Sequence, residues 1–164
     1  KKILAITAGL LTAMALTACG KDPKLTQFKG EIDAFCTEIS DIDTAINNVD
    51  AESDTATDEL LGYLDQLDTP FQNFAELDFP TEFDYLESLA DEASAYMTQA
   101  VESYHEAYSN GGYNQLTADY AKENYARAYK RIQIIITFLH GEQPENVNLT
   151  TAEETADAAS TTAE

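Results

Sequence analysis

The chain has 164 residues, with 30 acidic residues against 9 Lys and Arg and a formal net charge of −21. A basic face is needed to hold nucleic-acid phosphates, so this charge argues against a nucleic-acid partner. Hydrophobic residues make up 44% of the chain, which is enough for a core, while 7 Gly and 4 Pro disfavour a turn-rich all-β fold. Length and composition together indicate one acidic domain with few turns.

The first segment has the features of a secretory signal. Lys1 and Lys2 form a basic start, and residues 3–16 contain no charged side chain. This run is too short to span a bilayer as a stable helix, but it suits the apolar part of a signal peptide. It leads into a short series of small residues and a cysteine: Leu16, Thr17, Ala18, Cys19 and Gly20.

Residues 16–19 resemble the lipobox of bacterial lipoproteins, and all four positions match it. The resemblance, confined to this N-terminal segment, implies cleavage before Cys19 and diacylglycerol on the Cys19 sulfur. We therefore expect residues 1–18 to be a cleaved signal peptide and residues 19–22 to be a lipidated Cys with a short tether. Anchoring would then be at the extracytoplasmic face of a bacterial membrane. The alternative is an ordinary secretory signal whose cleavage point lies near a cysteine.

Residues 23–49 carry apolar residues at alternating steps of three and four. This spacing predicts a helix with one face packed lengthwise against its neighbours. Asp22 followed by Pro23 predicts the start of this helix, because Asp can accept a backbone N–H and Pro lacks one. The apolar positions are Leu25, Phe28, Ile32, Phe35, Ile39, Ile42, Ile46 and Val49.

Residues 54–77 repeat the same spacing and predict a second helix. Pro70 follows Thr69 inside this stretch, and we expect a kink or a new helix start there. If the helix breaks at Pro70, the fold would instead be three long helices with short pieces between them. The apolar positions are Leu60, Leu64, Leu67, Phe71 and Phe74.

Residues 81–109 predict a third helix that is rich in small residues. Thr81 marks its start, and residues 110–112 mark its end because Gly favours the left-handed conformation that follows a helix. The Ala positions would face larger side chains of other helices. The apolar positions are Phe83, Leu86, Ala90, Ala93, Met97, Ala100, Tyr104 and Ala107.

Residues 114–140 predict a fourth helix, which ends near Gly141 and Pro144. Its last turns contain Lys130, Arg131 and His140, whose positive charges suit the negative end of a helix dipole. Three further apolar residues, at 134, 136 and 138, widen its apolar face. The main stripe is Ala121, Tyr125, Ala128, Ile132, Ile135 and Leu139.

The predicted fold is all-α: residues 23–141 form an antiparallel up-down-up-down four-helix bundle with connections of about 3 to 5 residues. Residues 142–164 lack an apolar period and any Lys or Arg, so we expect a disordered acidic C-terminal tail. Because the first helix follows Cys19 closely, the bundle would sit near the membrane. An even number of antiparallel helices would place the tail on the membrane side.

Metal ligation has weak support in the sequence. Glu102 and His105 match one half of a di-metal bundle motif, but the stripe through Tyr104 turns both outward. Four acidic residues in the region 50–58 resemble part of a calcium loop, but the glycine and the final glutamate of that loop are missing. No cofactor and no metal site is therefore predicted. Cys36 is expected to be a packing residue.

The sequence predicts interaction rather than catalysis, because no nucleophile, base or phosphate loop stands in a recognisable pattern. Tyr85, Tyr120 and Tyr129 lie beside the apolar stripes and could form a surface that binds a protein or glycan. A second hypothesis is a small-ligand carrier with a cavity beside Ala90, Ala93 and Ala100. A metal-dependent enzyme is the third and weakest hypothesis.

Overall fold

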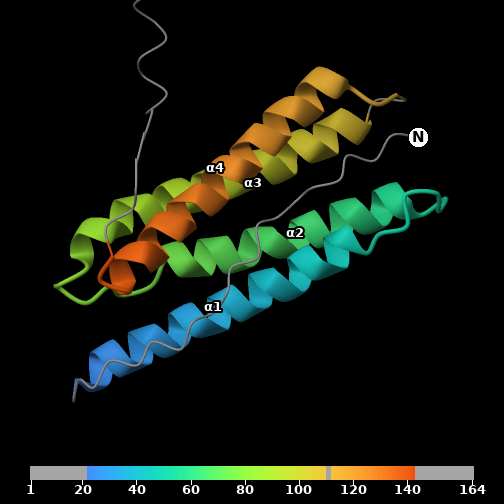
Figure 1. Cartoon of the computed structure of the whole chain (residues 1–164). Helices are drawn as coiled ribbons and strands as arrows, with labels where there is room; N and C mark the ends of the chain where they lie inside the picture. Colours follow the sequence, from blue (N-terminus) through green and yellow to red (C-terminus); the bar gives the residue numbers. More distant parts are fainter. Residues whose placement is uncertain (1–21, 110–111, 143–164) are drawn as a thin grey trace, which may run out of the picture.

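The computed structural model describes residues 22–109 and 112–142, and these residues form four α-helices, one short 3₁₀ helix and no strand (Figure 1). The all-helical prediction is confirmed for this part of the chain. The cleaved signal and the anchor predicted for residues 1–21, and the tail from residue 143 onward, lie outside the described residues. The elements are α1 (Pro23–Asn47), α2 (Ala56–Ala75), η1 (Asp84–Leu86), α3 (Glu87–Ser109) and α4 (Gln115–Leu139).

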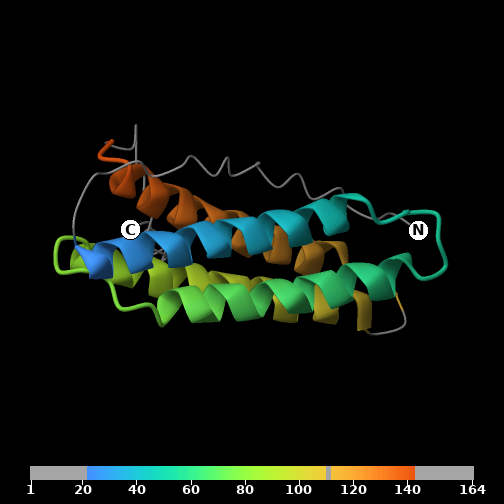
Figure 2. The same cartoon turned by 90° about the horizontal axis from the view of Figure 1, so that it is seen from below.

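The four helices form one bundle in which helices that are consecutive in the chain pack against each other. The closely packed pairs are α1 with α2, α2 with α3, and α3 with α4. Figures 1 and 2 show the helices as long rods lying side by side. The fourth side of the bundle, between α1 and α4, is closed through side chains that are described below.

The core is built mainly from the stripes that the sequence predicts. In α2 every stripe residue is buried, and the same holds for the main stripe of α4. In α1 the stripe is buried from Phe28 to Ile46 apart from Ile42, which is partly exposed, as are Leu25 and Val49 at its two ends. In α3 the four alanines of the stripe are fully buried, as close packing against larger side chains requires.

Helix α1 begins where the sequence predicts. The Asp22 side chain accepts a hydrogen bond from the backbone N–H of Lys24 at 2.9 Å, and Pro23 occupies the first helical position. One donor that the helix start would leave free is therefore satisfied by the residue just before it.

Helix α2 continues through Pro70, so the predicted restart at this residue is wrong and the three-helix alternative is not adopted. Pro70 removes one helical hydrogen bond, because its nitrogen has no hydrogen to donate. Pro70 is itself buried, and Leu67 and Phe71 are buried on either side of it. Packing of this apolar face therefore outweighs the lost hydrogen bond.

Helix α3 begins at Glu87, later than predicted, and η1 precedes it. The backbone N–H of Phe83 bonds to the carbonyl of Pro80, and that of Leu86 bonds to the carbonyl of Phe83. Such bonds between residues three apart define turns and 3₁₀ geometry, which Pro80 favours over a regular helix. The structure therefore replaces the first turns of the predicted helix by a tighter connection.

The first two connections are longer than the predicted 3 to 5 residues: they cover residues 48–55 and 76–83. The second one contributes to the core. Its Phe79 is buried, and the Phe79 ring centroid lies 4.9 Å from that of Phe28 and 6.1 Å from that of Phe74. A connection with its own buried aromatic residue can be long without being loose.

Candidate functional site

Two of the three predicted surface tyrosines are exposed. Tyr85, in η1, is 56% exposed, and its ring contacts that of Phe138 at a centroid distance of 5.8 Å. Tyr120, near the start of α4, is 50% exposed, and its hydroxyl lies 3.4 Å from the Gln99 amide oxygen. Tyr85 lies just before the start of α3, whereas Tyr120 lies beside Gln99 in the second half of α3. The structure therefore does not bring these two tyrosines together.

Tyr129 is buried, with 6% of its surface exposed, so its predicted place on the surface is wrong. Tyr129 follows Ala128 of the α4 stripe and is turned by about 100° from it around the helix. That turn points it toward α1 and α2 instead of toward solvent. Its ring contacts those of Phe71 at 5.6 Å and Tyr125 at 4.8 Å.

Tyr129 belongs to a buried polar cluster that joins α1 to α4. Asp43 of α1 is only 8% exposed. The Tyr129 hydroxyl donates to one carboxylate oxygen of Asp43 at 2.7 Å, and the Tyr125 hydroxyl donates to the other. The cluster therefore satisfies both oxygens of a carboxylate that the helices shield from water.

The electrostatics of this cluster follow from its burial. Loss of solvation raises the pKa of the Asp43 carboxyl above its ordinary value, and the hydrogen bonds from Tyr125 and Tyr129 oppose that shift without cancelling it. Burial and the neighbouring Asp43 raise the pKa of both tyrosines, so neither hydroxyl ionises near neutral pH. The cluster can therefore change its charge at one group only, the Asp43 carboxyl.

The sequence indicates that Asp43 is buried, although this residue was not among the predicted positions of the α1 stripe. Asp43 lies four residues after Ile39 and three before Ile46, so it shares their face of the helix. A charged residue with apolar neighbours at both helical spacings is placed in the core, where it needs partners. The partners lie in α4, about eighty residues away, and their identity depends on the tertiary structure.

Two further buried residues of α3 and α4 have polar atoms without a hydrogen bond within the described part of the chain. Asn124 is 0% exposed, and both its amide oxygen and amide nitrogen are unpaired there. The hydroxyl of Tyr104 is also unpaired, although its ring packs in the predicted stripe. Such groups usually lower stability, because they lose water without gaining a partner.

Arg131 is buried and does not act as an exposed charge at the end of α4. Its Nε donates to the Glu92 carboxylate at 2.9 Å, and its guanidinium lies 4.9 Å from the centroid of the Tyr96 ring. The guanidinium of Arg127 lies over the same ring at 5.7 Å. These contacts hold α3 to α4. They also place two of the few positive charges of this acidic protein between the helices.

The weak metal candidates remain apart in the structure. Glu102 is exposed, and the half-exposed His105 pairs with the Asp65 carboxylate at a distance of 2.7 Å between Nε2 and Oδ1. The acidic residues of region 50–58 lie in the first connection and the start of α2. In residues 22–109 and 112–142, no group of three or more His, Cys, Asp or Glu is arranged to hold a metal ion.

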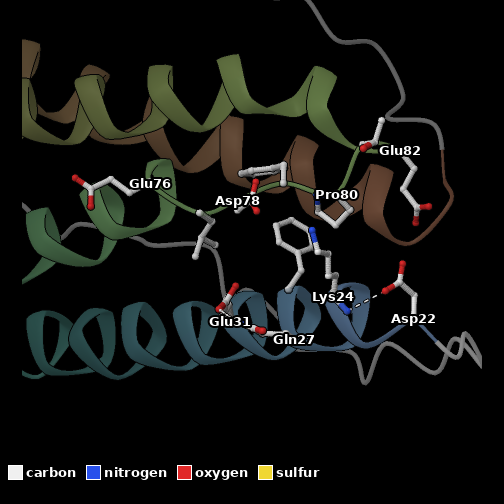
Figure 3. A pocket seen from close by; sticks show the side chains of 12 residues that line it. Asp22, Lys24, Gln27, Glu31, Glu76, Asp78, Pro80 and Glu82 are labelled. Atoms are coloured by element: carbon white, nitrogen blue, oxygen red, sulfur yellow. Dashed lines mark hydrogen bonds between the residues drawn. The ribbon is translucent and has the colours of Figure 1, made fainter.

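An open groove of about 510 Å³ lies between the first turns of α1 and the connection after α2 (Figure 3). Lys24 is the basic residue in the lining of this groove, and the buried residues Phe28 and Phe79 also line it. Five carboxylates line it: Asp22, Glu31, Glu76, Asp78 and Glu82. Its potential is therefore negative, and a cation would be favoured over an anion.

Of the two cysteines in the sequence, the structure describes Cys36. Cys36 is buried in the core as a free thiol, as predicted for a packing residue, and burial raises the pKa of this thiol to about 11. Cys19 lies outside the described residues.

The helices of residues 22–109 and 112–142 include none with the length and hydropathy needed to cross a membrane. No protein-family model, curated protein or solved structure matches this chain.

Proposed function

We propose that this protein is a lipid-anchored protein of the bacterial cell envelope, held at the extracytoplasmic face of a membrane through diacylglycerol on Cys19. Its acidic helical bundle binds a protein or glycan partner and does not catalyse a reaction. The observation that carries this proposal is the lipobox-like segment 16–19, which is followed almost at once by α1 with its Asp22 cap. A tether of three residues reaches about 10 Å, so the bundle would stand next to the headgroups.

We further infer that the bundle has an up-down-up-down antiparallel topology. Contacts between side chains support it for α2 with α3 and for α3 with α4, because the partner's residue number falls as the residue number in the first helix rises. The contacts are Asp65 with His105, Asp68 with Thr98, Gln99 with Tyr120, and Glu92 with Arg131. With this topology the C-terminal tail would leave the bundle at the anchored end, where α1 begins.

The charge pattern supports a role in binding. No Lys or Arg occurs between Lys29 and Lys122, a stretch that includes all of α2 and α3. These two helices therefore present carboxylates without cations of their own, and a cationic or hydrogen-bonding partner fits them best. Tyr85 and Tyr120 add exposed aromatic surface, which is enriched in interfaces.

The ligand-carrier hypothesis is less well supported. Ala90, Ala93 and Ala100 are fully buried in the packed core, and none of them lines the groove described above. That groove is open and lies at one end of the bundle, beside the start of α1. The surface-binding function therefore fits the geometry better than an internal ligand site.

The anchor can be tested with the two cysteines as a matched pair. In a bacterial host fed a radiolabelled fatty acid, Cys36→Ala should be labelled like the wild type and should stay with the membrane. Cys19→Ala should lose the label and the membrane attachment. Labelling of Cys19→Ala, or wild-type protein with an unmodified residue 19 by mass spectrometry, would refute the proposal.

The binding function can be tested with photo-crosslinking residues introduced in intact cells. Replacement of Tyr85 or Tyr120 should capture a discrete partner, and replacement of the exposed Gln133 serves as the control for random collision. High salt should weaken the capture, because it screens charge attraction. Equal capture from all three positions, or none from any, would contradict a binding surface at the tyrosines.

A further inference from the structure

The buried cluster of Asp43, Tyr125 and Tyr129 joins α1 to α4 through hydrogen bonds. Helix α1 packs closely on α2, and α4 packs closely on α3, whereas the α1–α4 pair is not among the closely packed ones. The two hydroxyls of α4 reach across this side and donate to the two carboxylate oxygens of Asp43. One ionisable group therefore contributes directly to the attachment of α1 to α4.

The groups around Asp43 do not neutralise its charge. From α4 it meets the neutral hydroxyls of Tyr125 and Tyr129, and from α3 Tyr104 lies near Tyr125. From α2 the apolar ring of Phe71 packs on Tyr129. The last turn of α1 contains no basic residue, and the free carbonyls there form the negative end of the helix dipole. The hydrogen bonds from the two hydroxyls favour the charged carboxylate, whereas burial and the helix dipole disfavour it, and the effect of burial is the larger one.

A proton on Asp43 does not have to break the cluster. A carboxylic acid donates one hydrogen bond and still accepts others, and a phenol oxygen can accept as well as donate. The protonated carboxyl can therefore donate to one tyrosine oxygen and accept from the other hydroxyl. Protonation keeps the link between α1 and α4 and removes its buried charge.

We propose that Asp43, Tyr125 and Tyr129 form a pH-sensitive latch, which holds α1 more firmly on α4 when the Asp43 carboxyl is protonated. The direction follows from the raised pKa of Asp43, whose ordinary value is 3.8. The extra stability is fully present below the unfolded-state value and is lost as the pH rises through the folded-state value. A protein exposed outside the cytoplasm would meet such changes in acidity directly.

Hydrogen exchange of the whole purified chain tests the latch. As the pH falls from about 7 to below 3.8, the protection factors of α1 amides should rise relative to those of α3, and the full rise should be tenfold for each unit of pKa difference between attached and detached α1. The carboxyl carbon of Asp43 should titrate in the nuclear magnetic resonance spectrum with a midpoint above 3.8, and α1 protection should follow the same midpoint.

Two matched variants separate the latch from the general effect of acid on an acidic protein. Asp43→Asn keeps the side-chain shape and hydrogen bonding, and it should make α1 protection nearly independent of pH. Asp41→Asn removes an exposed acid from the same helix and should respond as the wild type does. A pH response that survives in Asp43→Asn overturns the proposal. If that variant does not fold, the wild-type titration decides, and a midpoint at or below 3.8 overturns the proposal.

Discussion

At the scale of single residues, the informative positions of this protein are the polar ones in its core. Asp43, Asn124 and Arg131 are buried among the apolar stripes. Asp43 and Arg131 have partners on other helices, whereas the amide of Asn124 has none in the described part of the chain. Burial without a partner costs stability, and burial with a partner ties two helices together. These three residues therefore lead to different expectations for substitution.

Tyr129→Phe should destabilise the fold, because it removes one of the two hydroxyls that donate to the buried Asp43 carboxylate. We expect the free energy of unfolding to fall by about 1–3 kcal/mol in urea denaturation near neutral pH. The loss should be smaller in acid, where a protonated Asp43 needs fewer donors. The exposed Tyr120→Phe should change stability by less than about 0.5 kcal/mol. Equal effects of the two variants would contradict the buried cluster.

Asn124→Leu should stabilise the protein. Leucine has the same number and branching of side-chain heavy atoms and carries no unsatisfied donor or acceptor, so the desolvation cost of the amide disappears. The gain should be about 1–2 kcal/mol, measured by thermal and urea unfolding. Gln133→Leu on the exposed face of α4 should stay within about 0.5 kcal/mol of the wild type. A large loss in Asn124→Leu would show that the amide has a partner after all.

At the scale of elements, helix starts and ends follow local chemistry, while helix continuity follows packing. The caps of α1 and α4 are formed by Asp22 and Asn114, whose side chains accept backbone N–H groups of their first turns. Helix α2 continues through Pro70 because its apolar face is buried on both sides of that residue. The start of α3 shifts to Glu87 because the segment before it turns at Pro80. Local signals therefore set the boundaries only where tertiary packing does not oppose them.

Two glycines should respond in opposite directions to substitution by alanine. Gly30 lies inside α1, and a Cβ there would meet nothing within 4 Å, so Gly30→Ala should raise stability by about 0.5–1 kcal/mol. Gly141 follows α4 with a φ of +75°, so Gly141→Ala should lower stability by about 1 kcal/mol. Circular dichroism during thermal unfolding measures both changes. The same sign for both variants would contradict the assigned backbone conformations.

At the scale of the whole molecule, charge is the dominant feature. The chain carries a formal net charge of −21, and few cations are close enough to offset it. Arg127 and Arg131 pack against α3, and within the described residues α2 and α3 contain no Lys or Arg. Repulsion among the exposed carboxylates therefore opposes the compact state, and it is strongest when few dissolved ions screen these charges.

Salt should stabilise the protein. Between about 20 mM and 500 mM NaCl the thermal midpoint should rise by a few degrees, on the order of 1 kcal/mol, because the shorter Debye length weakens the repulsion among the surface carboxylates. MgCl₂ at equal ionic strength serves as the comparison. An equal rise in both salts indicates screening, whereas a larger rise with MgCl₂ indicates bound ions. A falling midpoint would contradict charge repulsion as a destabilising force.

Much of the fold could be predicted from apolar spacing alone, because burial of a helix face needs only a period close to that of the helix. The stripes of α2 and α4 are buried as the sequence indicates, and so is Cys36. The candidate surface was predicted less well. Tyr85 and Tyr120 are exposed as predicted, but Tyr129 is not, because a residue beside a stripe faces either solvent or a third helix depending on where that helix packs.

The sequence by itself determined the helical class, the Asp22 cap, the acidity and the N-terminal segment that supports the proposed anchor, since each depends on residues close together in the chain. Only the tertiary structure decided that Asp43 meets Tyr125 and Tyr129, that Phe79 fills the core and that Arg131 is buried against Glu92. These contacts join residues separated by tens of positions. The relative rotation of the packed helices sets them, and no local pattern encodes that rotation.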